Sequence, residues 1–505
     1  MEKELIIRKV RTASGAIAVQ LIRYEHSKRI VVRHIGSSHT DEELSALYQN
    51  AEIMREQLSK QLSLFPVVAE KSEPLPADRL QLASVTHRFS YMILRDCARI
   101  CGLSSLHSLY QDLALMRIIE PTSKLRTIEL LTRYFEVSYA ERTVYRLLPQ
   151  LMVHKDFIED AAYQTAKIHF EESFALVLYD VTTLYFESHE PDDDLRARGF
   201  SKDSKSQQPQ IVIGLLVTAQ GFPLKHETYK GNTFEGHTML GVVKQFQQRH
   251  PNTKPIIVAD AAMLSQENMQ VLESEGYQYI VGARLANGPR TFIHSLTTSL
   301  KREDGATIRL SYPNRAYDVI CSYSEKRAKK DRREFEKQMI RALEIIARNE
   351  SGKRTKFVKK SSNHSDSFIL DEALKEKAEM LIGIKGYCTN IPQERLSNAE
   401  VINYYHGLWR VEQAFRISKT DLKTRPIFHF THDAIKAHIL LCFMGLMMAK
   451  FLEIKTGLSI QRVRDILWTV HEAHIKDAFT GKCMTLRTNL AEFNDSKLAQ
   501  IFKPH

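Results

Sequence analysis

The chain has 505 residues, of which 43 % are hydrophobic and 26 % charged, a composition typical of a folded protein and not of a disordered one. Its 71 Lys and Arg residues exceed its 60 Asp and Glu residues, and the net charge of +11 favours a polyanionic partner, either nucleic acid or an anionic membrane surface. The six cysteines include no CxxC pair, which argues against a zinc ribbon or a disulfide framework and fits a reducing compartment.

Neither the N-terminal segment nor the most apolar segment has the pattern of a membrane element. Residues 1–12 lack the apolar core of a signal peptide. The longest apolar run, residues 439–452, is interrupted by Lys450 and is too short to span a bilayer. We therefore expect a soluble cytoplasmic protein with no membrane partner.

The first predicted unit, residues 1–65, combines a three-stranded β-meander with a helix. Short β-prone pieces separated by turns occupy residues 4–35, and their outward positions are rich in Arg and Lys. Acidic residues in the first turn indicate a helix over about 41–62. Three prolines then mark a linker near 64–80.

The second predicted unit, residues 75–170, reads as short helices joined by tight turns. The sequence Pro-Thr-Ser at 121–123 breaks one helix and caps the next, and a further start signal precedes 141–151. This pattern suits a helix-turn-helix-like DNA-binding region, although a plain helical bundle with solvated basic residues is the alternative. The basic residues concerned are Arg117, Lys124, Arg126, Arg133, Arg142 and Arg146.

A β-rich segment over 171–287 is predicted to form the first part of a catalytic core. Its first strand, over 174–186, is apolar and β-branched but is interrupted by Asp180, and its fourth strand ends in Asp260. The order β-β-β-α-β-α-β is that of a ribonuclease H-like mixed five-stranded sheet. In that topology the first and fourth strands are neighbours, which brings Asp180 and Asp260 together.

Residues 288–398 are predicted to form an insertion domain that interrupts the core. They contain short strands and the densest basic stretch of the chain, over about 325–360. These cations are interpreted as a surface that follows a DNA backbone, and the alternative is a solvated helix with ion pairs such as Arg332–Glu336.

The core resumes over 399–455, where residues 403–425 are predicted to form one helix with two stripes. One face is almost wholly apolar, and Tyr405, Glu412 and Lys419 recur every seven residues on a neighbouring face. An ordinary amphipathic helix with Glu412 paired to Arg416 is the alternative. The apolar face comprises Leu408, Val411, Phe415, Ser418 and Leu422.

Two further helices are predicted after this one. A helix over about 433–453 carries Met and Leu residues that belong in the core. Residues 459–475 read as an amphipathic helix within a C-terminal helical tail, 456–505.

The three carboxylates Asp180, Asp260 and Glu412 form an oxygen-only set of the kind that Mg²⁺ prefers. Two such ions activate the attacking oxygen and stabilise the leaving oxygen in a phosphoryl displacement, and we expect Mn²⁺ to substitute for Mg²⁺. Other roles remain open, because Asp180 is also placed to cap a turn through Thr182 or Thr183. Asp260 is likewise placed to open the helix that follows it.

Three segments together resemble the DDE transposases of bacterial insertion sequences: LVLYDVTTLYF, VADAAML and YHGLWRVEQAFRISKTDLKTRPIFHFTHDAIKAHI. They are similar to the insertion-sequence-four-like branch, which has a Tyr-x2-Arg-x3-Glu-x6-Lys signature around its third carboxylate. The resemblance extends over about residues 170–455. It implies a ribonuclease H-like core, a strand-containing insertion before the Glu, and cut-and-paste movement of a DNA element.

Carried over residue by residue, the resemblance implies that Asp180, Asp260 and Glu412 are the catalytic residues and the ligands of two metal ions. It also implies that Tyr405 and Lys419 contact DNA near the cleaved phosphate. The family further implies assembly as a homodimer on two paired element ends, with double-stranded DNA as partner. Such a protein would act in the cytoplasm, at the nucleoid.

This sequence departs from the family signature at Leu408, where the signature has an Arg. Arg410 and Arg416 are the candidates to supply that DNA contact, although Arg410 lies on a different helical face from Leu408. Some relatives stack a flipped base on a Trp in the insertion. The only tryptophans here, Trp409 and Trp468, lie outside it.

The sequence therefore predicts a metal-dependent transposase that binds terminal inverted repeats, cleaves DNA and joins the freed 3′-OH ends to a target. Two alternatives remain at this point. One is a DNA-binding protein without chemistry, either a regulator or a decayed transposase. The other is a ribonuclease H-like nuclease of another role.

Overall fold

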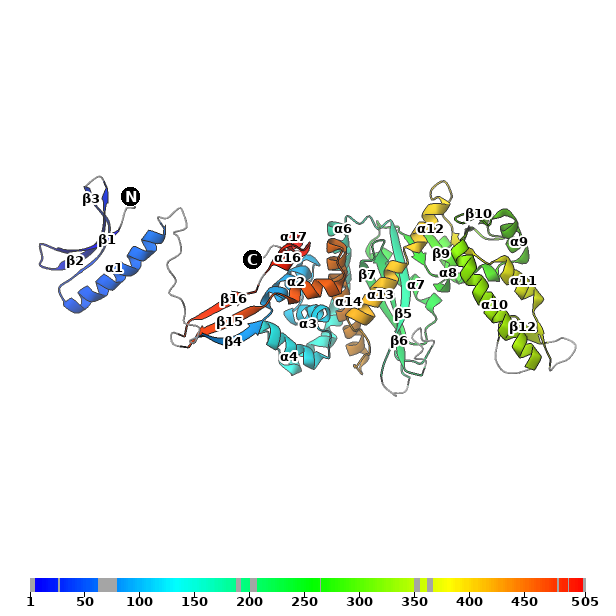
Figure 1. Ribbon diagram of the computed structural model, residues 1–505, viewed down its shortest axis with the longest axis horizontal. Coiled ribbons are helices and arrows are strands. Elements are labelled where there is room, and N and C mark those ends of the chain that lie inside the picture. Colours follow the sequence, from blue (N-terminus) through cyan, green and yellow to red (C-terminus); the bar gives the residue numbers. More distant parts are fainter. Residues whose placement is uncertain are drawn as a thin grey trace. The chain divides into compact units, whose positions relative to one another are not determined.

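The protein divides into two compact units, which a computed structural model describes (Figure 1). The described residues are 5–25, 28–61, 80–187, 192–199, 207–263, 265–348, 355–360, 367–478, 481–488 and 490–502. The smaller unit comprises Met1–Gln81 with Asp477–Lys482, and the larger unit comprises Leu82–Lys476 with Cys483–His505. The linker predicted near 64–80 lies, apart from its last residue, outside the described residues.

The smaller unit is built from a three-stranded antiparallel sheet and one helix. Strands β1 (Ile6–Arg11), β2 (Ile17–Glu25) and β3 (Lys28–Ser38) pair in chain order, and α1 spans Asp41–Gln61. Val19 of β2 packs with Leu44 and Ala51 of α1, so this unit has its own small core.

The larger unit begins with a strand, where the sequence pattern predicted only helices. Strand β4 (Leu80–Thr86) lies in a three-stranded sheet with β15 (Glu472–Asp477) and β16 (Cys483–Arg487). The predicted helical tail is wrong, because the described residues of 457–502 contain β15 and β16 besides α15 (Ile460–Trp468) and two single-turn helices. Strand β4 pairs with β15, nearly 400 residues away, which local pattern does not reveal.

Five α-helices follow β4: α2 (Arg88–Ile100), α3 (Ser108–Ile119), α4 (Lys124–Phe135), α5 (Glu141–Leu147) and α6 (Lys155–His169). The predicted break before α4 is confirmed, since the Ser123 hydroxyl accepts a hydrogen bond from the backbone N–H of Arg126. Arg117 and Lys124, predicted to be surface cations, are both buried instead.

An eight-stranded sheet, ordered β10-β11-β14-β9-β8-β5-β6-β7, is the centre of the larger unit. The strands nearest the candidate site are β5 (Leu176–Tyr185), β6 (Gln210–Thr218), β7 (Pro223–Lys230), β8 (Ile256–Ala259) and β9 (Gln278–Ala283). Strands β5, β6 and β7 are antiparallel, whereas β8 is parallel to both β5 and β9. As predicted, β5 and β8 are neighbours.

The prediction of a five-stranded sheet is wrong, because three strands of the predicted insertion extend the sheet beyond β9. These are β10 (Thr307–Ser311), β11 (Asp318–Tyr323) and β14 (Ile384–Thr389). Strand β14 pairs antiparallel with β9 over Gly386–Thr389 and so covers what would otherwise be an open strand edge. The remaining elements of this segment are α9 (Arg290–Ser299), α10 (Glu325–Arg348), α11 (Glu372–Met380) and the hairpin β12 (Val358–Lys360) and β13 (Phe368–Leu370).

The single helix predicted over 403–425 is wrong, because three short pieces replace it. They are α12 (Asn398–His406), α13 (Trp409–Arg416) and a π-helical turn (Ile417–Asp421). The α-helical hydrogen-bond pattern is interrupted after Gly407, where the Leu408 N–H donates to the Tyr405 carbonyl, although Gly407 and Leu408 keep right-handed helical dihedrals. The π-helical turn then changes the helical spacing before Lys419, so the seven-residue repeat no longer marks a single face.

Helix α14 (His432–Thr456) is the core helix that the sequence predicted. Among the described helices it alone is long and apolar enough to cross a membrane, yet 89 % of its most apolar window is buried inside the protein. Helices α7 (Met239–Arg249) and α8 (Gln266–Ser274) complete the fold around the sheet.

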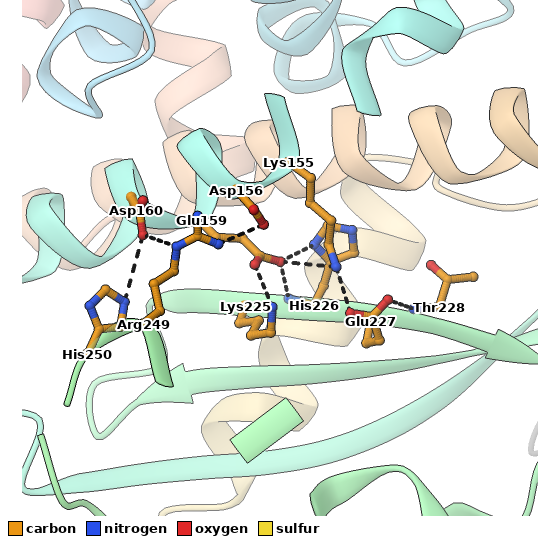
Figure 2. Close-up of polar contacts among 10 residues, drawn as sticks. All are labelled: Lys155, Asp156, Glu159, Asp160, Lys225, His226, Glu227, Thr228, Arg249 and His250. Atoms are coloured by element: carbon orange, nitrogen blue, oxygen red, sulfur yellow. Dashed lines mark hydrogen bonds and ion pairs between the residues drawn. The ribbon is translucent and has the colours of Figure 1, made fainter. Parts of the chain in front are cut away.

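Charged residues join α6 to the edge strand β7 and to the end of α7 (Figure 2). The Glu159 carboxylate is 4 % exposed and lies between the ammonium groups of Lys225 at 2.7 Å and Lys155 at 3.6 Å. The Arg249 guanidinium pairs with two further α6 carboxylates at 2.7 Å each. We call this set the α6–β7 charge cluster.

Candidate active site

The first two predicted carboxylates lie at matching positions on neighbouring parallel strands. Tyr179 of β5 is in register with Ala259 of β8, so the residues that follow them, Asp180 and Asp260, are side by side. Asp180 is half-buried and Asp260 is exposed. Each carboxylate accepts a hydrogen bond from the backbone N–H of the next residue, at 2.8 Å for Asp180 and 2.7 Å for Asp260.

Tyr405, at the end of α12, is tied directly to the second carboxylate. Its hydroxyl donates to Asp260 Oδ1 at 2.9 Å, and its side chain is buried. Burial and then the negative charge of Asp260 raise the pKa of the Tyr405 hydroxyl, so it remains a donor at neutral pH. Tyr405 is thus placed to orient Asp260.

Gly282 of β9 makes room for this hydrogen bond. A Cβ at this position would lie 2.5 Å from the Tyr405 hydroxyl oxygen, closer than non-bonded atoms approach. Residue 282 therefore has to be glycine for Tyr405 to reach Asp260 in this geometry. The sequence pattern did not single it out, because the contact depends on two elements more than 100 residues apart.

Glu412, the third predicted carboxylate, lies on α13, which packs against β5. The side chain is exposed, and its charge acts on both Tyr405 and a lysine of β14, Lys385. Within the described part of the chain, however, no three His, Cys, Asp or Glu side chains converge on one point as a ready-made metal site. The strands bring Asp180 and Asp260 together, and the charges of Asp260 and Glu412 both act on Tyr405 and Lys385.

The donor chemistry nevertheless fits a hard divalent cation. All three side chains supply carboxylate oxygens, and no thiol or imidazole is among them. Asp260 and Glu412 are exposed, which leaves open positions for water and substrate oxygens. Asp180, Asp260 and Glu412 are therefore the residues that would hold Mg²⁺.

The other predicted DNA-contacting residues, Lys419, Arg410 and Arg416, have different surroundings. The π-helical turn places Lys419 against a small cavity that is also lined by Thr182 of β5. The Arg410 guanidinium donates to the Ala219 carbonyl at the β6–β7 turn. Arg416 is exposed.

The apolar stripe of the predicted helix is confirmed in its buried members. Leu408, Val411, Phe415 and Leu422 are all buried, whereas Ser418 is half-buried. Leu408 therefore anchors this segment in the core, as its apolar side chain predicts, and the stripe survives although the helix is broken.

Lys385 on β14 faces the site, and the sequence did not point to it. Its ammonium lies 4.6 Å from the centre of the Tyr405 ring and 5.5 Å from that of Tyr387. Burial and the charge of Arg327 lower its pKa, whereas the negative charges of Asp260 and Glu412 oppose that shift. A lone Lys in an otherwise apolar strand was the only available signal, and the strand's pairing with β9 was needed to place it.

A cleft of about 480 Å³ opens beside Asp260 and Tyr405. Its basic lining comes from the segment predicted to be an insertion, and helices α10 and α11 form part of its wall. The cations that line it are Arg327, Lys356, Lys377 and Lys385, and the carboxylates are Asp260, Asp331 and Glu334. Arg327 pairs with Asp331 at 3.3 Å, so the lysines are the cations that suit a phosphate backbone.

The site combines Asp180 within β5, Asp260 directly after β8 and a glutamate on a helix that packs against β5. Together with the lysines of the cleft, this arrangement suits a nucleic-acid-processing class of site. A family model described as the transposase DDE domain matches residues 174–448, more than half of the chain, so the protein belongs to this transposase family. The activity that this family implies is that of a polynucleotidyl transferase or nuclease.

A solved structure with some likeness is the cryo-EM structure of a piggyBac transposase synaptic complex with hairpin DNA. The two chains share 10 % sequence identity and a TM-score of 0.38, over 75 % of this chain and 76 % of the other. A likeness this distant transfers no residue role. No curated protein matches the chain.

Proposed function

We propose that this transposase binds the terminal inverted repeats of an insertion sequence, cleaves DNA with divalent metal and joins the 3′-OH ends to target DNA. The observation that carries the proposal is the register of β5 with β8, which sets Asp180 beside Asp260 within the segment matched by the family. Its branch would be the insertion-sequence-four-like one, with Tyr405, Glu412 and Lys419 as signature residues.

The proposed catalytic core is ribonuclease H-like. The strand order β9-β8-β5-β6-β7, with an antiparallel β5-β6-β7 and a parallel β5-β8-β9, supports this assignment. The strands β10, β11 and β14 are then an extension that carries Lys385 to the site. The helical region over 75–170 remains a proposed DNA-binding region, as do Arg410 and Arg416 as proposed DNA contacts.

Two Mg²⁺ ions are the proposed cofactor, and when bound they supply activation of the attacking oxygen and stabilisation of the leaving oxygen. Asp180, Asp260 and Glu412 hold them. Tyr405 keeps the Asp260 carboxylate oriented through its hydrogen bond, and Lys385 places a positive charge near the incoming phosphate. The partner is double-stranded DNA, with a homodimer on two paired ends, in the bacterial nucleoid.

The direct test incubates the purified protein with Mg²⁺ and duplexes that carry the DNA flanking its gene. We expect strand cleavage at the element end and joined products with a second duplex. Tight binding without nicking in Mg²⁺ or Mn²⁺ would favour a DNA-binding protein without chemistry. Nicking without joined products would favour a nuclease of another role.

A further inference from the structure

The three-stranded sheet of the smaller unit has two unlike faces. One face packs on α1: Val19 contacts the α1 core residues, and the Lys9 ammonium lies 4.9 Å from the ring centre of Tyr48 on α1. Side chains alternate along a strand, so Arg8 and Gln20, each adjacent to one of these residues, point to the opposite side. We call that side the outer sheet face.

A row of three hydrogen-bonding side chains crosses the outer sheet face. Arg8 of β1 is directly opposite Gln20 of β2, and Gln20 is directly opposite His34 of β3. Arg8 and Gln20 are half-buried, and within the described part of the chain their side chains form no hydrogen bond or ion pair. The exposed His34 ring lies 3.4 Å from the Ser37 hydroxyl. The Arg8 and Gln20 groups are therefore available to an external ligand.

The chemistry of the row matches the edges of base pairs. An Arg guanidinium binds the two acceptors of guanine, and a Gln amide binds the donor and acceptor of adenine in the major groove. Apolar side chains on the same face, Ile6 and Val31, are 43 % and 46 % exposed and suit contact with a thymine methyl group. Tyr24 is 53 % exposed and lies opposite Arg29 in the next row.

The charge of the sheet favours the same ligand. Residues 5–38 contain seven Lys and Arg residues and a single acidic residue, Glu25. Such an excess on one small sheet attracts a polyanion and releases counterions on binding. The major groove also admits a two-stranded antiparallel ribbon, and β1 with β2 forms one.

We propose that the outer sheet face binds double-stranded DNA in the major groove and reads base identity through Arg8, Gln20 and His34. The proposal rests on the proposed function for its DNA substrate. It goes beyond that function by assigning sequence recognition to the smaller unit, where the sequence pattern had placed DNA binding in the helical region over 75–170.

The test is a selection with the full-length protein from duplexes of 40 base pairs whose central 20 are randomised. We expect the wild-type protein to enrich a motif. Arg8→Ala and Gln20→Ala should each lose preference at one or two base pairs and weaken binding to the selected duplex about tenfold or more. Their binding to a shuffled duplex should change by no more than about threefold.

Arg55→Ala is the matched control, because Arg55 is an exposed cation on α1 and its loss changes the net charge as Arg8→Ala does. Arg55→Ala should weaken binding to the selected duplex and binding to the shuffled duplex by the same factor. Failure of the wild-type protein to enrich any motif would overturn the proposal, as would equal effects of Arg8→Ala and Arg55→Ala on both duplexes. If Gln20→Ala has an altered circular-dichroism spectrum, Gln20→Glu replaces it. Gln20→Glu keeps the length of the side chain and should abolish the base preference that Gln20→Ala was expected to lose.

Failure of the proposed function is distinguishable from failure of this inference. Asp180→Asn should enrich the same motif as the wild-type protein while losing cleavage of the selected duplex. If Asp180→Asn cleaves normally, the assignment of the active site is wrong but the readout by the sheet stands. A second outcome is that Asp180→Asn enriches the wild-type motif and loses cleavage, as expected, while Arg8→Ala still enriches the full motif. In that case only the sheet proposal is wrong.

Discussion

Two groups of charged side chains on the same large unit differ in how their charges are satisfied. In the α6–β7 charge cluster, buried Glu159 has two ammonium partners and a backbone N–H donor, from His226, at 3.4 Å (Figure 2). In the candidate active site, Asp260 and Glu412 are exposed, and the ammonium of Lys385 lies over the ring of Tyr405. The first group stabilises the fold, whereas the second has charge left for a ligand.

The difference shows why burial and pairing separate structural from functional carboxylates. A buried carboxylate without partners costs several kcal/mol, so Glu159 must be paired wherever the fold keeps it. An exposed carboxylate at a strand end is solvated and can exchange water for a metal ion. The two groups should therefore respond oppositely to the same isosteric substitution.

The largest effect on activity is expected for Asp180→Asn and Asp260→Asn. Each removes a negative charge from the proposed metal ligands, and cleavage should fall by about 10²–10³-fold or more. The free energy of unfolding should change by less than about 1 kcal/mol, because Asn keeps the size of the side chain and Asp260 is exposed. Cleavage of an end duplex in Mg²⁺ and urea unfolding measure the two quantities, and retained cleavage would contradict the site.

The opposite result is expected for Glu159→Gln in the α6–β7 charge cluster. This substitution leaves the buried Lys225 ammonium without its carboxylate, whereas Lys155 keeps Glu227 at 2.6 Å, and it should cost about 3–5 kcal/mol of unfolding free energy. Cleavage per folded molecule should be unchanged. If Glu159→Gln lost cleavage but kept the wild-type stability, the cluster would have a role in catalysis and not in the stability of the fold.

Gly282→Ala sharpens the role of the hydrogen bond from Tyr405 to Asp260. The added methyl group overlaps the tyrosine hydroxyl and should lower cleavage about 10–100-fold, the range typical for residues that orient a metal ligand. Tyr405→Phe removes the same hydrogen bond without a clash and should give a similar loss. Normal cleavage by Tyr405→Phe would show that Asp260 needs no such support.

Lys385→Met tests whether the strand added beyond β9 contributes to the site. The lost positive charge should lower cleavage about tenfold, and Lys385→Arg should recover much of it because the charge returns. Lys356, another cation of the same cleft, provides the matched control, since Lys356→Met removes an equal charge. Equal losses in both variants would indicate a general field effect and no specific role for Lys385.

The smallest effect concerns the pH dependence of stability. Burial lowers the pKa of His226 beside Glu159 well below its usual value, and it lowers that of His87 to about 4. These histidines bind protons more readily when unfolded, so their contribution to stability is full above about pH 6.5 and decreases as the pH falls. Unfolding free energies measured between pH 7 and 4 should decline, and His87→Phe should flatten that decline.

Much of the larger unit could be predicted because its strands are long apolar runs with clear ends. The β-branched segment around Asp180 and the run ending at Asp260 have no other stable placement than a buried sheet, and their pairing follows from the strand order. The capped start of α4 at Ser123 was equally local. What depends on neighbouring residues was therefore predictable.

What depends on distant partners was not predictable. The interruption after Gly407 and the π-helical turn that carries Lys419 change the helical spacing that a heptad count assumes. Strand β14 looks like any short strand until its pairing with β9 is known, so Lys385 could not be placed at the site. The need for glycine at residue 282 becomes clear only from its contact with the Tyr405 hydroxyl.

The central claim is that Asp180, Asp260 and Glu412 hold divalent metal together, although the side chains do not yet converge on one point. Bound Fe²⁺ tests it directly, because with ascorbate and peroxide it cuts the polypeptide next to its ligands. The polypeptide should be cut at three places, near residues 180, 260 and 412. Excess Mg²⁺ should suppress these cuts, and Asp180→Asn should abolish them. Cuts elsewhere, or cuts unchanged in Asp180→Asn, would contradict it.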